Sequence, residues 1–80
     1  MKVPAIKALV EKYSIFQLIE AEAALYEEQA PEIEIEGDDE GEQLTHVLAA
    51  IWIKKDMEQN GTDVRTSLRN YTVKVRNSIN

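Results

Sequence analysis

The segment of residues 43–59 constrains the fold more than any other part of this 80-residue chain. At about 100° per residue, its apolar side chains point in almost every direction around a helix axis. One broad face carries bulky residues, namely Leu44, Val47, Leu48, Ile51 and Trp52. Because a helix that is apolar on all sides has to be buried on all sides, this segment predicts a central helix surrounded by other elements.

The opposite side of this helix carries a narrower row of residues, which we call the seam: His46, Ala50, Ile53 and Met57. Their spacing is that of a coiled-coil contact, and a small residue such as Ala50 allows a second helix to approach closely. One short chain covers both faces only if its other helices wrap fully around the central one. We therefore expect a second copy to cover the seam, most simply in a two-fold homodimer. The alternative is a monomeric bundle with this helix at its centre.

Two helices are predicted before the central one. Pro4 suits the first turn of a helix over about residues 4–12, because the N–H that proline lacks would have no partner there. Ser14 and Gln17 have the form of a capping box, which begins a second helix over about residues 15–29. This second helix is expected to bury one arc of side chains: Ile15, Leu18, Ile19, Leu25 and Tyr26.

A fourth helix is predicted after the central one. Gly61 is the expected left-handed residue that ends the central helix near Asn60. The fourth helix then spans about residues 63–78, with one apolar stripe made of Val64, Leu68, Tyr71, Val75 and Ile79. The sequence as a whole predicts one all-α domain, residues 1–80, folded as a small three- to four-helix bundle.

Residues 32–36 alternate glutamate and isoleucine, which is typical of a short strand with both isoleucines on one face. Pro31 precedes them and ends the second helix. A strand of five residues needs a partner, and no second strand-like run exists in the sequence. One interpretation is an extended connector whose Ile33 and Ile35 pack on the helices. The other is a two-stranded ribbon with a second copy, which adds Ile33 and Ile35 to the predicted self-association residues His46, Ala50, Ile53 and Met57.

The net charge of −6 is unevenly distributed, with the acids in the centre and an excess of Lys and Arg at both ends. An acidic centre opposes binding to nucleic acid or to an anionic membrane. Basic ends beside an acidic middle suit pairing within the chain, or head-to-tail contact between copies.

The N-terminal segment does not have the pattern of a signal peptide, because Lys7, Glu11 and Lys12 interrupt its apolar residues. The longest uninterrupted apolar run, residues 47–53, is too short to span a bilayer. The chain has no cysteine, so it has neither a disulfide nor a thiolate metal site. We expect a cytoplasmic protein.

The familiar metal and nucleic-acid motifs do not fit. The acidic turn near Gly41 lacks the final glutamate of a calcium loop, since Val47 stands at that position. A di-iron bundle needs a glutamate three residues before its histidine, whereas Gln43 precedes His46. The basic residues of the fourth helix suggest a helix-turn-helix, but the helix before them is too long and too apolar: Arg65, Arg69, Lys74 and Arg76. We therefore predict no metal, no cofactor and no nucleic-acid partner.

Glu22 is the carboxylate that most needs an explanation, because it lies within the apolar arc of the second helix. A buried carboxylate needs a partner, such as Lys7, Arg65, Arg69 or Tyr26, unless the edge of the arc is open to water. A functional alternative pairs Glu22 with His46 as acid and base. No nucleophile with a base beside it and no phosphate-binding loop accompanies this pair, so we predict no catalytic residues.

Several stretches resemble a family of short bacterial proteins of unknown function. They are MKVPAIKALVE at residues 1–11, DEGEQLTHVLAAIWI at 39–53 and LRNYTVKVR at 68–76. The resemblance covers most of the chain but depends on helical patterning. It implies a small helical bacterial protein and transfers no functional residues.

These observations favour a small acidic interaction or structural module that is not an enzyme and that self-associates. The first alternative is a small enzyme or ligand-binding subunit with a pocket at the subunit junction, near Glu22 and His46. The second alternative is a subunit of a larger hetero-complex, in which a different protein covers the apolar second face.

Overall fold

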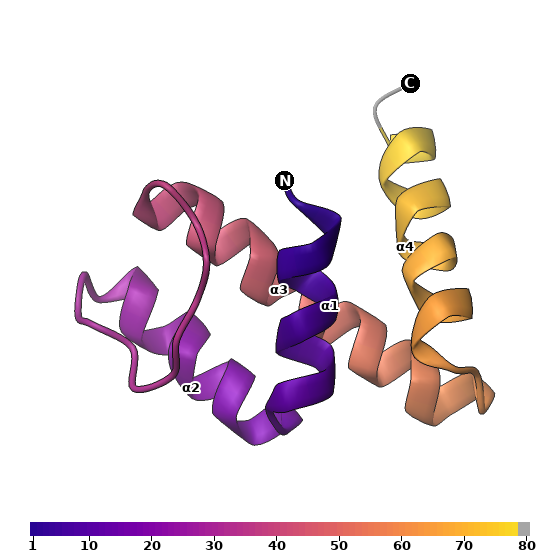
Figure 1. Ribbon diagram of the computed structural model, residues 1–80, viewed down its shortest axis with the longest axis horizontal. Helices are drawn as coiled ribbons and strands as arrows, with labels where there is room; N and C mark the ends of the chain where they lie inside the picture. The colour runs from indigo at the N-terminus through magenta and orange to yellow at the C-terminus, as the bar shows by residue number, and fades with distance from the viewer. Residues whose placement is uncertain (79–80) are drawn as a thin grey trace.

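The structure is a computed structural model that describes residues 1–78 of the chain (Figure 1). In these residues it contains helices and no strand, which confirms the predicted all-α class. The helices are α1 (Val3–Lys12), α2 (Ile15–Tyr26), α3 (Glu40–Asn60) and α4 (Val64–Ser78). Ile79, which we predicted to extend the stripe of the fourth helix, lies outside the described residues.

Helix α3 is the centre of the bundle. It contacts each of the other three helices, and α1 also contacts α4. Figure 1 shows α2 and α4 on opposite sides of the molecule, with α1 between them. The α3 side chains that form the core are almost completely buried: Val47, Ala49, Ala50, Ile51 and Ile53. Within one chain, α3 therefore lies at the centre of the bundle, packed against the other three helices.

Helix α1 runs along α3 in the same direction and is hydrogen-bonded to it near both ends. At the start of α1, the backbone N–H of Lys2 donates to Nε2 of His46 at 2.9 Å. Near its end, Nζ of Lys54 donates to the carbonyl oxygen of Val10 at 3.1 Å. In each pair the two residues are 44 positions apart in the sequence, so the register of α1 against α3 is the same at both ends of the contact. The Lys54 ammonium group also satisfies the carbonyl oxygen of Val10, which lies in the last turn of α1 and has no partner within α1.

The seam is an internal surface of the bundle, which corrects the predicted contact with a second copy. His46, Ala50 and Ile53 are each 0% exposed in the single chain, and Met57 is partly buried against the core. The chain's own α1 lies along this side of α3. The prediction was wrong because elements of the same chain pack on both faces of α3, with α1 along the seam. On the bulky face, Leu48 was predicted to be buried but is 38% exposed.

The capping signals that are local in the sequence form as predicted. The N–H of Ser14 donates to Oε1 of Gln17 at 2.9 Å, and the N–H of Gln17 donates to Oγ of Ser14 at 3.2 Å. Asp39 caps α3 by accepting the N–H of Glu42 at 2.7 Å. Gly61 ends α3 in the left-handed conformation, with φ of 64°.

Helix α2 ends earlier than predicted, at Tyr26 and not near residue 29. Glu28 adopts a left-handed conformation, with φ of 58°. The N–H of Gln29 then donates back to the carbonyl oxygen of Ala24 at 2.8 Å, and the N–H of Glu28 donates to that of Leu25 at 3.2 Å. This pair of bonds is a Schellman motif, which normally has glycine at the left-handed position.

The connector, residues 27–39, is extended around residues 32–36. Its backbone groups there form hydrogen bonds with side chains and not with a second strand. Three consecutive residues are held in this way: Glu34 N–H by Tyr13 Oη at 3.2 Å, Ile35 O by Gln43 Nε2 at 3.1 Å, and Glu36 O by His46 Nδ1 at 2.7 Å. Ile35 is only 7% exposed and Ile33 packs against the core. Within one chain the segment is the expected extended connector, with Ile35 buried in the core and Ile33 packed on it, while pairing of residues 32–36 with a second copy stays a prediction.

Candidate interaction surface

His46 is a structural residue in the interior of the bundle. A backbone N–H only donates and a carbonyl oxygen only accepts, so Nε2 accepts from Lys2 and Nδ1–H donates to Glu36. These two partners assign the neutral imidazole with its hydrogen on Nδ1. With both nitrogens engaged and 0% of its surface exposed, His46 cannot act as an acid or base on a bound molecule in this conformation.

Glu22 lies on a half-open edge of α2, which is one of the alternatives given by the sequence. It makes no hydrogen bond and no ion pair with any residue that the structure describes. The expected partners Lys7, Arg65, Arg69 and Tyr26 do not reach it. The structure therefore does not join Glu22 and His46 into an acid–base pair.

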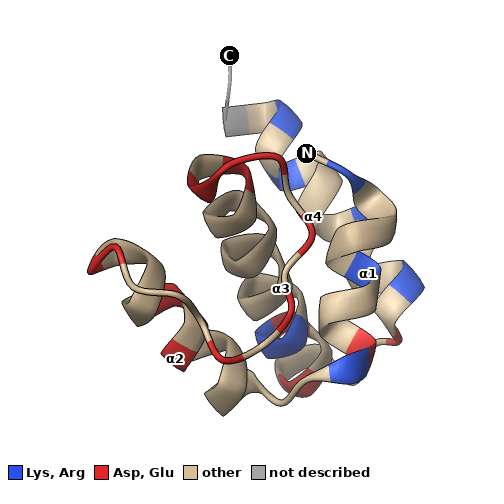
Figure 2. Cartoon of the chain, turned by 60° about the vertical axis from the view of Figure 1, so that its left-hand side comes forward, with Lys and Arg blue, Asp and Glu red and all other residues tan. Residues whose placement is uncertain are grey.

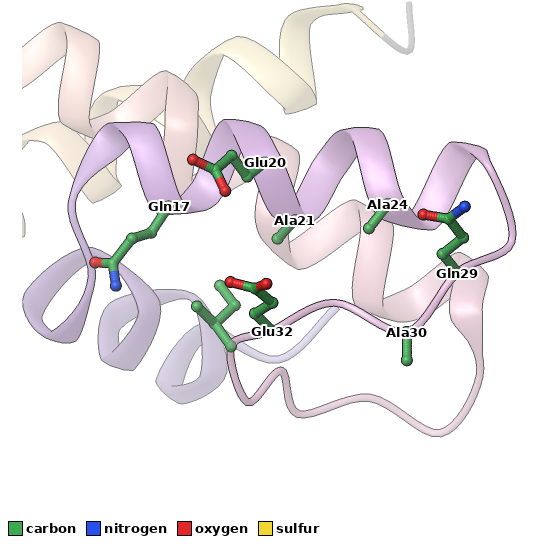
Figure 3. A pocket seen from close by; sticks show the side chains of 8 residues that line it. Gln17, Glu20, Ala21, Ala24, Gln29, Ala30 and Glu32 are labelled. Atoms are coloured by element: carbon green, nitrogen blue, oxygen red, sulfur yellow. The ribbon is translucent and has the colours of Figure 1, made fainter.

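A hollow of about 320 Å³ lies between α2 and the connector (Figure 3). Ala21 and Ala24 point into it from α2, and Glu20 and Glu32 lie on facing sides of it. Both carboxylates are exposed, and the other polar residues that line the hollow are Gln17 and Gln29. Within residues 1–78 no three His, Cys, Asp or Glu side chains come together as metal ligands.

Three of the exposed large apolar side chains in the described residues lie in one row on α2, which with Ala23 we call the outer stripe: Phe16, Ile19, Ala23 and Tyr26. Phe16 is 74% exposed, Tyr26 is 62% exposed and Ile19 is 42% exposed. Ile19 and Tyr26 were predicted to be buried, and their exposure is a further correction. The apolar arc of α2 is wider than the contact with α3, which buries a different set of residues: Leu18, Ala21 and Leu25.

Only acids surround the outer stripe on its own helix. Glu20 and Glu27 follow one side of it and Glu22 follows the other, at about 100° per residue. Residues 15–26 contain no Lys and no Arg. The surface of α2 therefore combines apolar contact area with negative charge.

A groove between α1 and α4 has the opposite charge; we call it the α1/α4 groove. Its volume is about 440 Å³, and it is lined by Val3, Lys7, Glu11, Val64, Arg65 and Leu68. Val3 is 45% exposed, whereas Val64 and Leu68 are partly buried. Lys7 and Arg65 are exposed at its rim, with Glu11 as the one acid.

The two kinds of charge are separated in space as well as in sequence. Figure 2 shows the acids gathered on α2 and the connector, and Lys and Arg gathered on α1 and α4. In the described part of the chain, the ion pairs within 4.0 Å are those of Lys2 with Asp38 at 3.9 Å and with Glu42 at 3.8 Å. Pairing within the chain therefore leaves most of the basic residues of α1 and α4 without an acid at close range.

The outer stripe had a signal in the sequence that the prediction did not use. Its members are spaced by three, four and three residues, the same kind of pattern that singled out the seam. The seam was preferred because it lies on the more apolar helix. Burial of a row depends on where the other helices pack, which the spacing alone does not determine.

The fold and its surfaces define a small all-α protein in which three helices and a connector pack against a central helix. The chain belongs to a family of unknown function, DUF6952, whose family model matches residues 1–80. Neither curated proteins nor solved structures gave a match. No helix in the described residues is long and apolar enough to cross a membrane.

Proposed function

We propose that this protein is a non-enzymatic interaction module that self-associates through the outer stripe of α2. The observation that carries this proposal is the exposure of Phe16, at 74%, in line with Ile19 and Tyr26 on one helix. Isolated exposed apolar residues are ordinary, but a contiguous row bordered by charged residues is typical of a protein contact. The aromatic residues at its two ends are of the types that dominate contact energies.

The size of the chain supports the same proposal. A single core in 80 residues buries a smaller share of the surface that the unfolded chain exposes than the core of a larger domain does. With no cysteine, the chain has no disulfide to add stability. Association of copies is the usual remaining source of stability in so small a domain.

The interior position of His46 argues against the rival proposal of an enzyme pocket near Glu22 and His46. A site at a subunit junction needs catalytic groups at the surface of each copy, and His46 has none of its surface exposed. A partner subunit of different sequence remains the natural competitor, since it would use the same outer stripe.

We also propose that the protein works in the cytoplasm of a bacterium. The support is the resemblance of the sequence to short bacterial proteins, together with the packing of Ile6 and Leu9 of α1 in the core. Fractionation of cells that express the chain with a C-terminal tag tests this proposal, and recovery in a secreted or membrane fraction would contradict it.

The test of self-association is the mass in solution, measured by light scattering and by sedimentation equilibrium at micromolar to millimolar concentration. The wild type is expected to exceed the 9.1 kDa of one chain, and Phe16→Glu to return to that mass. Val73→Glu is the matched control, because Val73 is also exposed, at 48%, and lies on α4. It is expected to behave as the wild type.

Circular dichroism of each variant separates loss of association from loss of folding. A folded wild type that stays at the mass of one chain at every concentration would refute self-association. A Phe16→Glu variant that associates like the wild type would show that the outer stripe is not the contact.

A further inference from the structure

We infer that the outer stripe of one copy docks in the α1/α4 groove of a second copy, a head-to-tail contact. This inference rests on the proposed function, which identifies the outer stripe as the contact surface, and it adds the identity of the surface that receives it. Three observations carry it: the charge around the stripe, the lining of the groove, and the positions of the two surfaces in the fold.

The charge around the outer stripe opposes a symmetric contact between two α2 helices. Such a contact places the acids that border one stripe beside the same acids of the second copy, in either relative orientation: Glu20, Glu22 and Glu27. Residues 15–26 supply no cation to offset them. Like charges brought together in an interface oppose that partner, so the favoured partner is a basic surface.

The α1/α4 groove is the basic surface that also offers apolar area. We call its apolar lining residues the floor (Val3, Val64 and Leu68) and its exposed cations the rim (Lys7 and Arg65). Arg69 follows Arg65 one turn further along α4 and is exposed. A volume of about 440 Å³ is in the range of pockets that receive compact apolar groups, such as the ring of Phe16.

In the docked arrangement, apolar residues contact apolar residues, and acidic residues face basic residues. The apolar stripe meets the apolar floor, while the acids that border the stripe face the basic rim. Glu11 is the one rim residue with unfavourable charge. The complementarity predicts that added salt weakens the association, because screening reduces attraction between exposed charges. A symmetric contact between acidic helices would be strengthened by salt.

The positions of the two surfaces require separate copies. Figure 1 shows α2 and α4 on opposite sides of the molecule, so a chain cannot dock its own stripe in its own groove. Each copy therefore offers one stripe and one groove. Such heterologous contacts close into a ring or continue as a chain of copies, in contrast to the two-fold homodimer expected from the seam.

The decisive experiment combines two variants that each lack one surface. Phe16→Glu removes the stripe and retains the groove, whereas Lys7→Glu with Arg65→Glu reverses the rim and retains the stripe. Each variant alone is expected at the mass of one chain. An equimolar mixture is expected to form a complex of twice that mass and no larger, because the remaining stripe and groove make a single contact.

The matched control for the rim is Lys55→Glu with Lys74→Glu, which changes the charge equally at exposed residues that do not line the groove. It is expected to associate within about threefold of the wild type, against a weakening of about tenfold or more for the rim variant. Circular dichroism confirms that every variant is folded.

The outcomes separate failure of this inference from failure of the proposed function. If the rim variant associates like the wild type while Phe16→Glu does not, the stripe is the contact but the groove is not its receptor. The groove is equally refuted if the mixture stays at the mass of one chain or if the control weakens association as much as the rim variant. If the wild type itself is a single chain, the proposed function fails as well.

Discussion

The Nε2 atom of His46 accepts the backbone N–H of Lys2 at 2.9 Å, across 44 residues of sequence. On the other side of the same ring, Nδ1–H donates to the carbonyl oxygen of Glu36 at 2.7 Å. One buried side chain therefore joins the start of α1, the connector and α3. Burial of a polar group is costly unless the group is hydrogen-bonded. Here the imidazole, the N–H of Lys2 and the carbonyl oxygen of Glu36 satisfy one another.

Replacement of the ring tests this relationship. We expect His46→Ala to lower the free energy of unfolding by about 2–4 kcal/mol, because it leaves a cavity and removes the partners of Lys2 N–H and Glu36 O. Urea unfolding followed by circular dichroism measures the change. Thr45→Ala is the control at the exposed neighbouring position and should cost about 0.5 kcal/mol or less. A loss below about 1 kcal/mol for His46→Ala would contradict the role assigned to the ring.

Alanine substitutions at two glycines near the start of α3 are expected to have opposite effects on the stability of the fold. A Cβ atom at Gly37 would lie 2.8 Å from Cγ and 2.9 Å from the backbone nitrogen of Gln43, so the connector or the helix must shift. We expect Gly37→Ala to destabilise the fold by about 1–3 kcal/mol. At Gly41 the nearest atom is Oδ1 of Asp39, at 3.4 Å, and alanine favours the helix. Gly41→Ala should therefore be neutral or stabilise by up to about 1 kcal/mol, in the same unfolding assay.

The parts of the fold that were predictable from the sequence are those set by neighbouring residues. The capping box of Ser14 and Gln17 and the left-handed Gly61 involve residues within one turn of each other, so their signals are complete in a short window. The alternation in residues 32–36 correctly indicated an extended segment. The all-α class follows from these local signals together with the apolar periodicity.

The parts that were not predictable depend on residues far apart in the sequence. The partner of His46 is Lys2, and no local pattern shows that α1 lies along the seam. The packing of α2 is likewise not shown by any local pattern, because its apolar arc is wide enough for α3 to pack on either edge of it. Packing on α3 buries Leu25 and leaves Tyr26 at 62% exposure, so the outer stripe became recognisable only once the helices were placed.

The end of α2 offers a stabilising substitution. Glu28 has φ of 58°, a conformation that costs a residue with a Cβ atom about 1–2 kcal/mol and costs glycine much less. Glycine loses more conformational entropy on folding, which offsets part of this gain. We expect Glu28→Gly to raise the free energy of unfolding by about 0.5–1 kcal/mol, measured by urea titration. Glu27→Gly, one residue earlier and at negative φ, is the control and should lower it.

Two hydrogen-bonded carboxylates at the turn between α3 and α4 are expected to make the stability of the fold sensitive to acid. Hydrogen bonds from Asn70, Ser67, Asn60 and Thr62 hold the pKa of Asp56 below its ordinary 3.8. The backbone N–H of Thr66 does the same for the pKa of Asp63, which caps α4. A carboxylate whose folded-state pKa is lowered adds stability above its unfolded pKa, and this stability is lost as the pH falls through the folded value. The free energy of unfolding should therefore decline below about pH 4.

Asp56→Asn and Glu58→Gln distinguish this local effect from the titration of the other acids. Asp56→Asn should be less stable than the wild type near neutral pH and should show a shallower decline in acid, because the titrating group has been removed. Glu58 is exposed and makes no hydrogen bond with any described residue, so Glu58→Gln should follow the wild-type curve. Trp52, the only tryptophan, packs on Tyr71 of α4 with ring centroids 5.5 Å apart, so its fluorescence reports whether α4 is docked. Equal slopes for wild type and Asp56→Asn between pH values of about 2 and 5 would show that Asp56 does not contribute to the acid response.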